Sequence, residues 1–176
     1  MTAELVFTNL KVSDADRLPS ATSLRAPLMC LAEARYGIIF GTVGAARDCL
    51  ETALAYAATR EQFDGPIARH QMTQAKFAAM ATRLNTAMLL ALHIGKIKDA
   101  GKIQPQQISM GKYNNAMAAL EIAREARSIL GGAGITTEYS VFRHMANLET
   151  VLTYEGTHEI HSLVIGEALT GIPAYR

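Results

Sequence analysis

From residue 28 onward, short turns are the only interruptions to helix-forming sequence. Each interruption carries glycine or proline, and they fall near residues 61–66, 100–102, 131–134 and 154–156. Between them, apolar residues recur near the 3.6-residue period of an amphipathic helix. Because long helices joined by short connections pack as antiparallel neighbours, the sequence predicts an all-α, up-down four-helix bundle.

Residues at the ends of these segments favour three long helices followed by two short ones. Pro105 suits the first turn of a helix, where its missing N–H is not needed, and Gly131 suits a C-cap. Gly37, Gly41 and Gly44 lie on one face of the first helix, and we expect them to let another helix pack closely. The expected spans are 28–59, 71–99, 105–130, 137–149 and 157–169.

The N-terminal part has a different character. Residues 4–12 are rich in β-formers with rough alternation, so we expect a short strand there. Residues 13–27 contain aspartate, proline, serine and threonine, which is typical of a connector. The predicted organisation is a strand and connector at 1–26 and a helical domain at 27–176.

Composition and charge exclude several function classes. A formal net charge of +1 gives no electrostatic reason to expect nucleic acid or an acidic membrane surface as partner. No apolar run approaches the ~20 residues of a membrane span, and the first residues lack the signal-peptide pattern, so a cytoplasmic location is expected. Cys30 and Cys49 lie about 28 Å apart if they share a helix, so we expect two free thiols in apolar surroundings.

The segment Tyr154–His161 says most about chemistry. Glu155 places one carboxylate on a turn, and Gly156 lets the backbone approach a ligand closely. Thr157 can cap the following helix through its side-chain oxygen. Such a turn suits a general base held against a bound substrate. From these residues alone, an ordinary helix start with a surface glutamate is the alternative.

From about residue 26 to 176, the sequence closely resembles the C-terminal helical domain of acyl-CoA dehydrogenases, nearest the glutaryl-CoA dehydrogenase branch. The resemblance implies the family's helical bundle, a homo-oligomer (dimer or tetramer), and a remnant of its middle β-domain at 1–26. The matching segments, in the family's order and spacing, are 31–37, 60–63, 66–71, 130–135, 154–158 and 169–172.

The resemblance implies oxidation of an acyl-CoA to the trans-2-enoyl thioester, with FAD as hydride acceptor and electron-transfer flavoprotein as partner. Glu155 would remove the α-proton while the base's own backbone N–H and a flavin hydroxyl polarise the thioester carbonyl, as an oxyanion hole does. The nearest branch implies glutaryl-CoA as substrate, with decarboxylation to crotonyl-CoA, and a mitochondrial matrix location in a eukaryote.

The same resemblance assigns the remaining site residues. Arg35, Tyr154 and Gly156 would contact substrate, although a salt bridge within the bundle is an equal alternative for Arg35. Arg60 would reach the FAD pyrophosphate of a neighbouring subunit. The other FAD-contacting positions are Gln62, His70, Gln71, Ser128, Gly131, Gly132, Thr157, His158 and Glu159.

Three departures from the family pattern bear on these assignments. Asp64 stands where glycine is usual, near the expected pyrophosphate, and Ser128 stands where relatives often carry Gln or Asp. Family members are also considerably longer, and the arginine that binds the distal carboxylate of glutaryl-CoA lies in the portion absent here. A truncated, flavin-free helical oligomerisation module is therefore the alternative function.

A metal site is not favoured. Glu155 and His158 formally satisfy the Glu-x-x-His pattern of di-iron bundles. That site needs a second such pair, which the sequence lacks, and Gly156 would disrupt the helix it requires. We therefore expect no metal.

Overall fold

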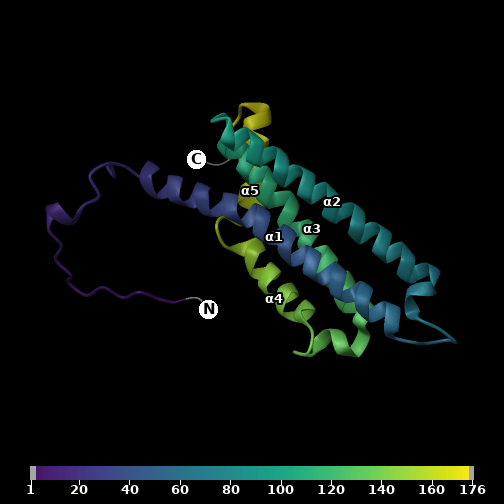
Figure 1. Cartoon of the computed structure of the whole chain (residues 1–176). Helices are drawn as coiled ribbons and strands as arrows, with labels where there is room; N and C mark the ends of the chain where they lie inside the picture. The colour runs from purple at the N-terminus through teal and green to yellow at the C-terminus, as the bar shows by residue number, and fades with distance from the viewer. Residues whose placement is uncertain (1–2, 175–176) are drawn as a thin grey trace.

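The computed structural model describes residues 3–174, and every regular element in that range is helical. Three long helices, α1 (Arg25–Thr59), α2 (Gln71–Asp99) and α3 (Pro105–Leu130), lie side by side, and two shorter ones follow, α4 (Ser140–Thr153) and α5 (His158–Thr170) (Figure 1). α3 packs against each of the other four. The prediction of an all-α bundle is confirmed, although α4 begins and ends later than expected.

The boundaries of α3 follow from local chemistry. Pro105 is its first residue. The N–H of Gln104 donates to Oε1 of Gln107 at 2.9 Å, and the N–H of Gln107 donates to the carbonyl oxygen of Gln104 at 3.0 Å. The helix ends where Gly131 adopts φ +58°, a conformation that glycine adopts without steric cost. The chain then continues as a short 3-10 helix, η3 (Gly131–Ile135).

Small residues on α3 let α1 approach closely. Ala116, Ala119 and Ala123 are at most 1% exposed and pack with buried residues of α1. Asn115 is fully buried, and its Nδ2 donates to the carbonyl oxygens of Ile39 in α1 and Ala87 in α2, at 3.2 and 3.1 Å. This side chain therefore ties the three long helices together at one level of the bundle.

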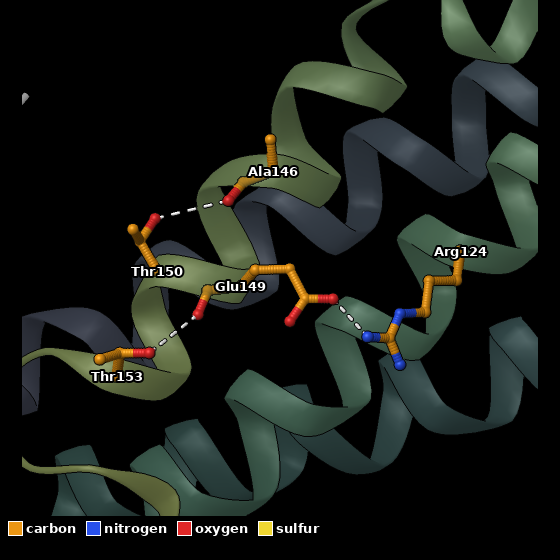
Figure 2. A network of polar contacts seen from close by, with 5 residues as sticks. All are labelled: Arg124, Ala146, Glu149, Thr150 and Thr153. Carbon is orange, nitrogen blue, oxygen red and sulfur yellow. Dashed lines mark hydrogen bonds and ion pairs between the residues drawn. The ribbon is translucent and has the colours of Figure 1, made fainter.

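α4 is joined to α3 by an ion pair between Arg124 and Glu149, whose side chains point toward each other in Figure 2. Both side chains are about half exposed, 54% and 50%, so the pair contributes little more than about 1 kcal/mol. Thr150 and Thr153 bond back to carbonyls of their own helix, those of Ala146 and Glu149. α4 ends at Thr153, and the turn containing Glu155 follows directly.

The strand predicted at residues 4–12 is wrong. This segment runs away from the bundle without strand pairing (Figure 1), and its apolar side chains are exposed, Phe7 at 70% and Leu5 at 78%. Alternating β-formers give a strand only when a second strand supplies hydrogen bonds, and no such partner lies within residues 3–174.

In the turn between α1 and α2, two residues with side chains adopt left-handed backbone conformations. The positive φ values fall on Phe63 (54°) and Asp64 (64°), and the N–H of Gln62 bonds to the carbonyl of Gly65 at 2.9 Å. Gly65 is buried, and a Cβ there would lie 2.7 Å from Nη1 of Arg69. Gly65 itself does not have a positive φ, and a side chain there would require the exposed side chain of Arg69 to move.

The two cysteines both lie on α1 as predicted, and both are free thiols. Cys49 is buried, and burial, followed by the charge of Asp48, raises the pKa of its thiol to about 12. Cys30 is exposed, so the expectation of apolar surroundings is wrong for this residue. It lies near the start of α1, where few other elements cover the helix.

α1 and α2 are long and apolar enough to span a membrane by length and composition alone, which the sequence analysis did not anticipate. Only 11% and 28% of their most apolar windows are buried in this chain. The observation is weak evidence for a membrane span, because helices of a soluble bundle pass the same test. It shows that much apolar helix surface faces outward.

Candidate active site

Glu155 lies on the turn between α4 and α5 and is half-buried. Its φ of +59° is unusual for a residue with a side chain, and Gly156 follows with φ +90°. The Oε2 atom is buried and has no hydrogen-bond partner. Burying a carboxylate oxygen without a hydrogen-bond partner costs free energy. Because no protein group bonds to Oε2, this atom is available to accept a proton from a ligand.

Cationic side chains hold the backbone of this turn from behind. Nε of Arg35 donates to the carbonyl oxygen of Glu155 at 2.6 Å. Nζ of Lys112 donates to the carbonyl of Gly156 at 2.6 Å and also to that of Tyr154. Among residues 3–174 Arg35 forms no salt bridge with an acidic side chain, so that alternative is wrong.

Lys112 is 1% exposed. Burial, and then the positive charge of Arg35, lower its pKa to about 8, while Glu155 acts in the opposite direction. The ammonium also lies 5.8 Å from the centre of the Tyr154 ring. Lys112 thus contacts the residue before Glu155 and the residue after it.

His161 closes the site from α5. Its ring is 1% exposed, and neither ring nitrogen forms a well-aligned hydrogen bond. Burial, followed by the charges of Lys112 and Arg35, lowers the pKa of His161 to about 4, with partial opposition from the backbone of Glu155 and Gly156. A Cβ on Gly156 would lie 3.1 Å from two atoms of this ring, so the residue after Glu155 has little room for a side chain.

The N-terminus of α5 carries three of the predicted cofactor residues. The Thr157 hydroxyl accepts from the N–H of Ile160 at 3.3 Å, which confirms the predicted N-cap. The His158 ring stacks on Tyr113 with centroids 3.9 Å apart. The backbone N–H of Glu159 itself and the Thr157 hydroxyl hold the pKa of the Glu159 carboxyl below its usual range.

A groove of about 560 Å³ runs between α1 and α4 and reaches Tyr154. Gly37, Gly41 and Gly44 line it, and a Cβ at any of them would meet no atom within 4 Å. The expected close packing of a helix on this glycine face is therefore wrong within this chain, since the face borders open space. The other lining residues include Ala34, Ile38, Leu148 and Val151 near the Glu155 turn, and Arg143, His144 and Asn147 farther along.

The remaining predicted cofactor residues gather at the opposite end of the long helices. A pocket of about 270 Å³ is lined by Gln62, His70 and Ser128. Nε2 of His70 lies 3.2 Å from the carbonyl oxygen of Gln62, and the Ser128 hydroxyl accepts from Lys76 at 2.8 Å. Arg60, Gln71, Gly131 and Gly132 border the same end and are exposed.

The two groups of predicted residues do not meet within one chain. Lys112 and Ser128 are 16 positions apart on α3, which corresponds to about 24 Å along the helix axis. One pyrophosphate group therefore cannot contact the Glu155 turn and the Ser128 pocket of the same copy.

Residues 24–170 match the family model described as "Acyl-CoA dehydrogenase, C-terminal domain". The chain belongs to the acyl-CoA dehydrogenase family. This confirms the family suggested by the sequence motifs and makes the chain part of an oxidoreductase family.

Similar proteins agree with this assignment. The crystal structure of glutaryl-CoA dehydrogenase from Mycobacterium smegmatis has 62% sequence identity and a TM-score of 0.91, covering 93% of this chain and 42% of that one. A structure of glutaryl-CoA dehydrogenase from the same organism in complex with FADH2 has 59% identity and a TM-score of 0.86, covering 88% and 40%. An acyl-CoA dehydrogenase of Bacillus subtilis is 35% identical over 97% of this chain and 45% of the relative.

The chain thus spans less than half the length of these relatives. Within the site, the sequence analysis missed Lys112 and His161. A signal for Lys112 existed, because Ser109, Lys112 and Asn115 recur at three-residue spacing on the face of α3 that is otherwise apolar and buried.

Proposed function

We propose that this chain carries the catalytic base of an FAD-dependent acyl-CoA dehydrogenase, with Glu155 removing the α-proton of an acyl-CoA. The observation that carries the proposal is the buried, unpartnered Oε2 of Glu155 on a turn beside an apolar groove. An ordinary surface glutamate would point into water. This one is half-buried, and the backbone around it is held by Arg35 and Lys112.

The arrangement suits proton abstraction from a weak carbon acid. A general base must lie within hydrogen-bond reach of the proton that it removes, and Oε2 of Glu155 has no protein partner that would compete for it. Arg35 and Lys112 bond to backbone carbonyls rather than to the carboxylate, so they fix the turn without occupying the base. FAD, when bound, supplies the acceptor for the hydride that leaves the β-carbon.

The groove between α1 and α4 suits the acyl chain. Its wall near the Glu155 turn consists of Ala34, Ile38 and Val151, and Tyr154 stands at the junction with the turn. An acyl group lying along this wall would present its α-carbon to Glu155 and bury apolar surface. The open face of α1 formed by Gly37, Gly41 and Gly44 leaves room for the acyl chain.

The residues present fit FAD as a ligand shared between two copies. The N-terminus of α5 offers backbone N–H groups to an anion, and Thr157 and His158 lie there. Arg60 offers a guanidinium fork, which matches phosphate oxygens well. Because these sites are about 24 Å apart along α3, we propose that Arg60, Gln62 and His70 serve the cofactor held at the Glu155 turn of a neighbouring copy.

Glutaryl-CoA, with decarboxylation to crotonyl-CoA, is the proposed substrate. The support is the 62% identity to the Mycobacterium smegmatis glutaryl-CoA dehydrogenase. We also propose electron-transfer flavoprotein as acceptor, and a cytoplasmic location or, in a eukaryote, the mitochondrial matrix, because the chain belongs to the acyl-CoA dehydrogenase family. The arginine expected to bind the distal carboxylate lies outside this chain.

A flavin-free oligomerisation module is the second candidate, and one observation favours it. Large apolar side chains are exposed on the long helices, among them Leu54 at 44%, Leu89 at 67% and Leu92 at 54%. Such surface drives association when it is covered by another copy.

A hybrid enzyme separates the two candidates. This chain replaces the corresponding C-terminal region of the Mycobacterium smegmatis enzyme, and the purified hybrid and the chain alone are passed through a desalting column after incubation with FAD. We expect the hybrid to retain flavin and to convert glutaryl-CoA to crotonyl-CoA and CO2, detected by mass spectrometry. A folded hybrid that retains flavin but dehydrogenates neither glutaryl-CoA nor butyryl-CoA contradicts the proposed base, and a folded hybrid without flavin supports the module.

A further inference from the structure

Three consecutive backbone carbonyls around the proposed base accept hydrogen bonds from cationic side chains, the buried Lys112 and the half-buried Arg35. The carbonyls of Tyr154 and Gly156 accept from Nζ of Lys112, the latter at 2.6 Å, and the carbonyl of Glu155 accepts from Nε of Arg35 at 2.6 Å. No other part of residues 3–174 directs three successive carbonyls at charged side chains. The arrangement is centred on the one residue that carries the proposed chemistry.

The direction of these carbonyls determines where the N–H groups point. All peptide bonds in the described part of the chain are trans, so each N–H is antiparallel to the carbonyl of the same peptide unit. With the Tyr154 carbonyl held by Lys112, the N–H of Glu155 faces away from the bundle. The N–H of Gly156 does likewise because Arg35 holds the Glu155 carbonyl.

Neither of these two N–H groups donates a hydrogen bond within residues 3–174. Two adjacent free N–H groups on a turn with φ values of +59° and +90° form a concave donor pair of the kind that binds an anionic oxygen. In an acyl-CoA dehydrogenase, negative charge develops on the thioester oxygen as the α-proton leaves. Preorganised donors aimed at that oxygen stabilise the transition state.

We propose that Lys112 is a positioning residue, whose ammonium locks the peptide units flanking Glu155 so that the base and its adjacent N–H groups face the substrate together. The reaction named here rests on the proposed function; the geometric role of Lys112 does not. The hydrogen bonds of the ammonium support a positioning role for Lys112 rather than direct participation in the reaction. Two of its three N–H bonds go to carbonyls, and the ring of Tyr154 lies 5.8 Å away on a remaining side.

Position 112 is buried, where an apolar residue would be usual, and the hydrogen bonds of Lys112 explain why a lysine is stable there. Lys112 is 1% exposed and lies among Ser109 and Asn115 on the core face of α3. An unpaired charge there would be costly, whereas the two carbonyls of a turn need donors that no backbone group supplies. The ammonium of Lys112 therefore supplies donors for the two turn carbonyls, and these carbonyls supply acceptors for the buried ammonium.

Nuclear magnetic resonance on the 176-residue chain tests the role without flavin or substrate. Lys112→Met removes the ammonium and keeps the length of the side chain, Lys112→Arg keeps charge and donors, and Lys102→Met is a control at an exposed lysine. We expect backbone order parameters of Glu155 and Gly156 near 0.85 in the parent and the control, and below about 0.6 in Lys112→Met. Lys112→Arg should restore much of the order.

A second measurement on the unmodified chain keeps the proposal testable if Lys112→Met fails to fold. A buried ammonium bonded to two carbonyls exchanges its protons slowly, so Lys112 should give a protected ammonium signal correlated with the carbonyl carbons of Tyr154 and Gly156. The absence of that signal overturns the proposal. So does a folded Lys112→Met whose turn keeps parental order parameters.

In the flavin-loaded dehydrogenase that carries this chain, Lys112→Met should lower kcat by about 100-fold, because the base and its donors would be misplaced. Flavin content and KM should stay within about twofold of the parental values, because the proposal places the ammonium in contact with neither ligand. Equal losses in flavin content and kcat would indicate a merely structural role and overturn the proposal. If the parent dehydrogenase is inactive, the proposed function fails while the resonance experiment still decides the role of Lys112.

Discussion

Protonation of His161 should destabilise this bundle in mild acid. The ring is 1% exposed, and it faces the positive charges of Lys112 and Arg35 on one side and the Glu155–Gly156 backbone on the other. Its pKa is lowered from 6.5 to about 4. Because the folded-state value lies below the unfolded one, the unfolded chain binds one more proton between these pH values.

The free energy of unfolding therefore falls as the pH drops from 6.5 to about 4. The lowering of the His161 pKa from 6.5 to about 4 corresponds to about 3 kcal/mol of stability. This is a large share of the roughly 5–15 kcal/mol that is typical of a folded domain. Above pH 6.5 the ring is neutral in both states and this contribution to stability is fully present.

Urea denaturation at a series of pH values between 7.5 and 4 measures the effect. His161→Leu fills similar space with a group that does not titrate, and His93→Leu is the matched control, because His93 is exposed on α2. We expect the parent and His93→Leu to lose about 3 kcal/mol more than His161→Leu over the acid range, since titrating carboxylates contribute equally to all three. Identical pH dependence for the parent and His161→Leu would refute the reasoning.

Three further predictions test the fold and the groove. Gly134→Ala should destabilise the bundle by about 2 kcal/mol or more, because its Cβ would lie 2.3 Å from the backbone oxygen of Arg127, whereas Gly132→Ala meets no atom within 4 Å and should change the urea midpoint little. Thr157→Ala should cost about 1 kcal/mol through loss of the N-cap of α5; an unchanged midpoint would show that the cap is not needed. Gly41→Leu should not lower the thermal midpoint, because leucine is a better helix former than glycine and a Cβ there would meet no atom within 4 Å. The same variant should raise KM for acyl-CoA in the hybrid enzyme, because the side chain would occupy the groove; an unchanged KM would place the acyl chain elsewhere.

The helical framework was predictable because the residues that start and end each helix act through their own backbone preferences. Pro105 and Gly131 mark the ends of α3 through their own backbone preferences, and the structure places them there. The turn at Glu155 was predictable for the same reason, since Gly156 and the Thr157 cap act within a few residues. Local chemistry of this kind needs no knowledge of what packs nearby.

Features that depend on distant contacts were predicted poorly. Residues 4–12 have the alternation of a strand but no strand to pair with in the described part of the chain. The glycine face of α1 indicated only that something could approach closely, and α4 leaves it open as a groove wall. Lys112 reaches the Glu155 turn across 42 to 44 positions of sequence, a contact that periodicity could flag but not assign.

The central claim is that Glu155 is the base, and anaerobic bleaching of the flavin tests it most directly. The hybrid enzyme, its Glu155→Gln variant and a Glu138→Gln control, altered at an exposed carboxylate outside the site, are mixed with glutaryl-CoA while the flavin absorbance is followed. We expect the parent and the control to bleach at the same rate and Glu155→Gln to retain its flavin but bleach at least about 100-fold more slowly. Bleaching of Glu155→Gln at the parental rate would contradict the account.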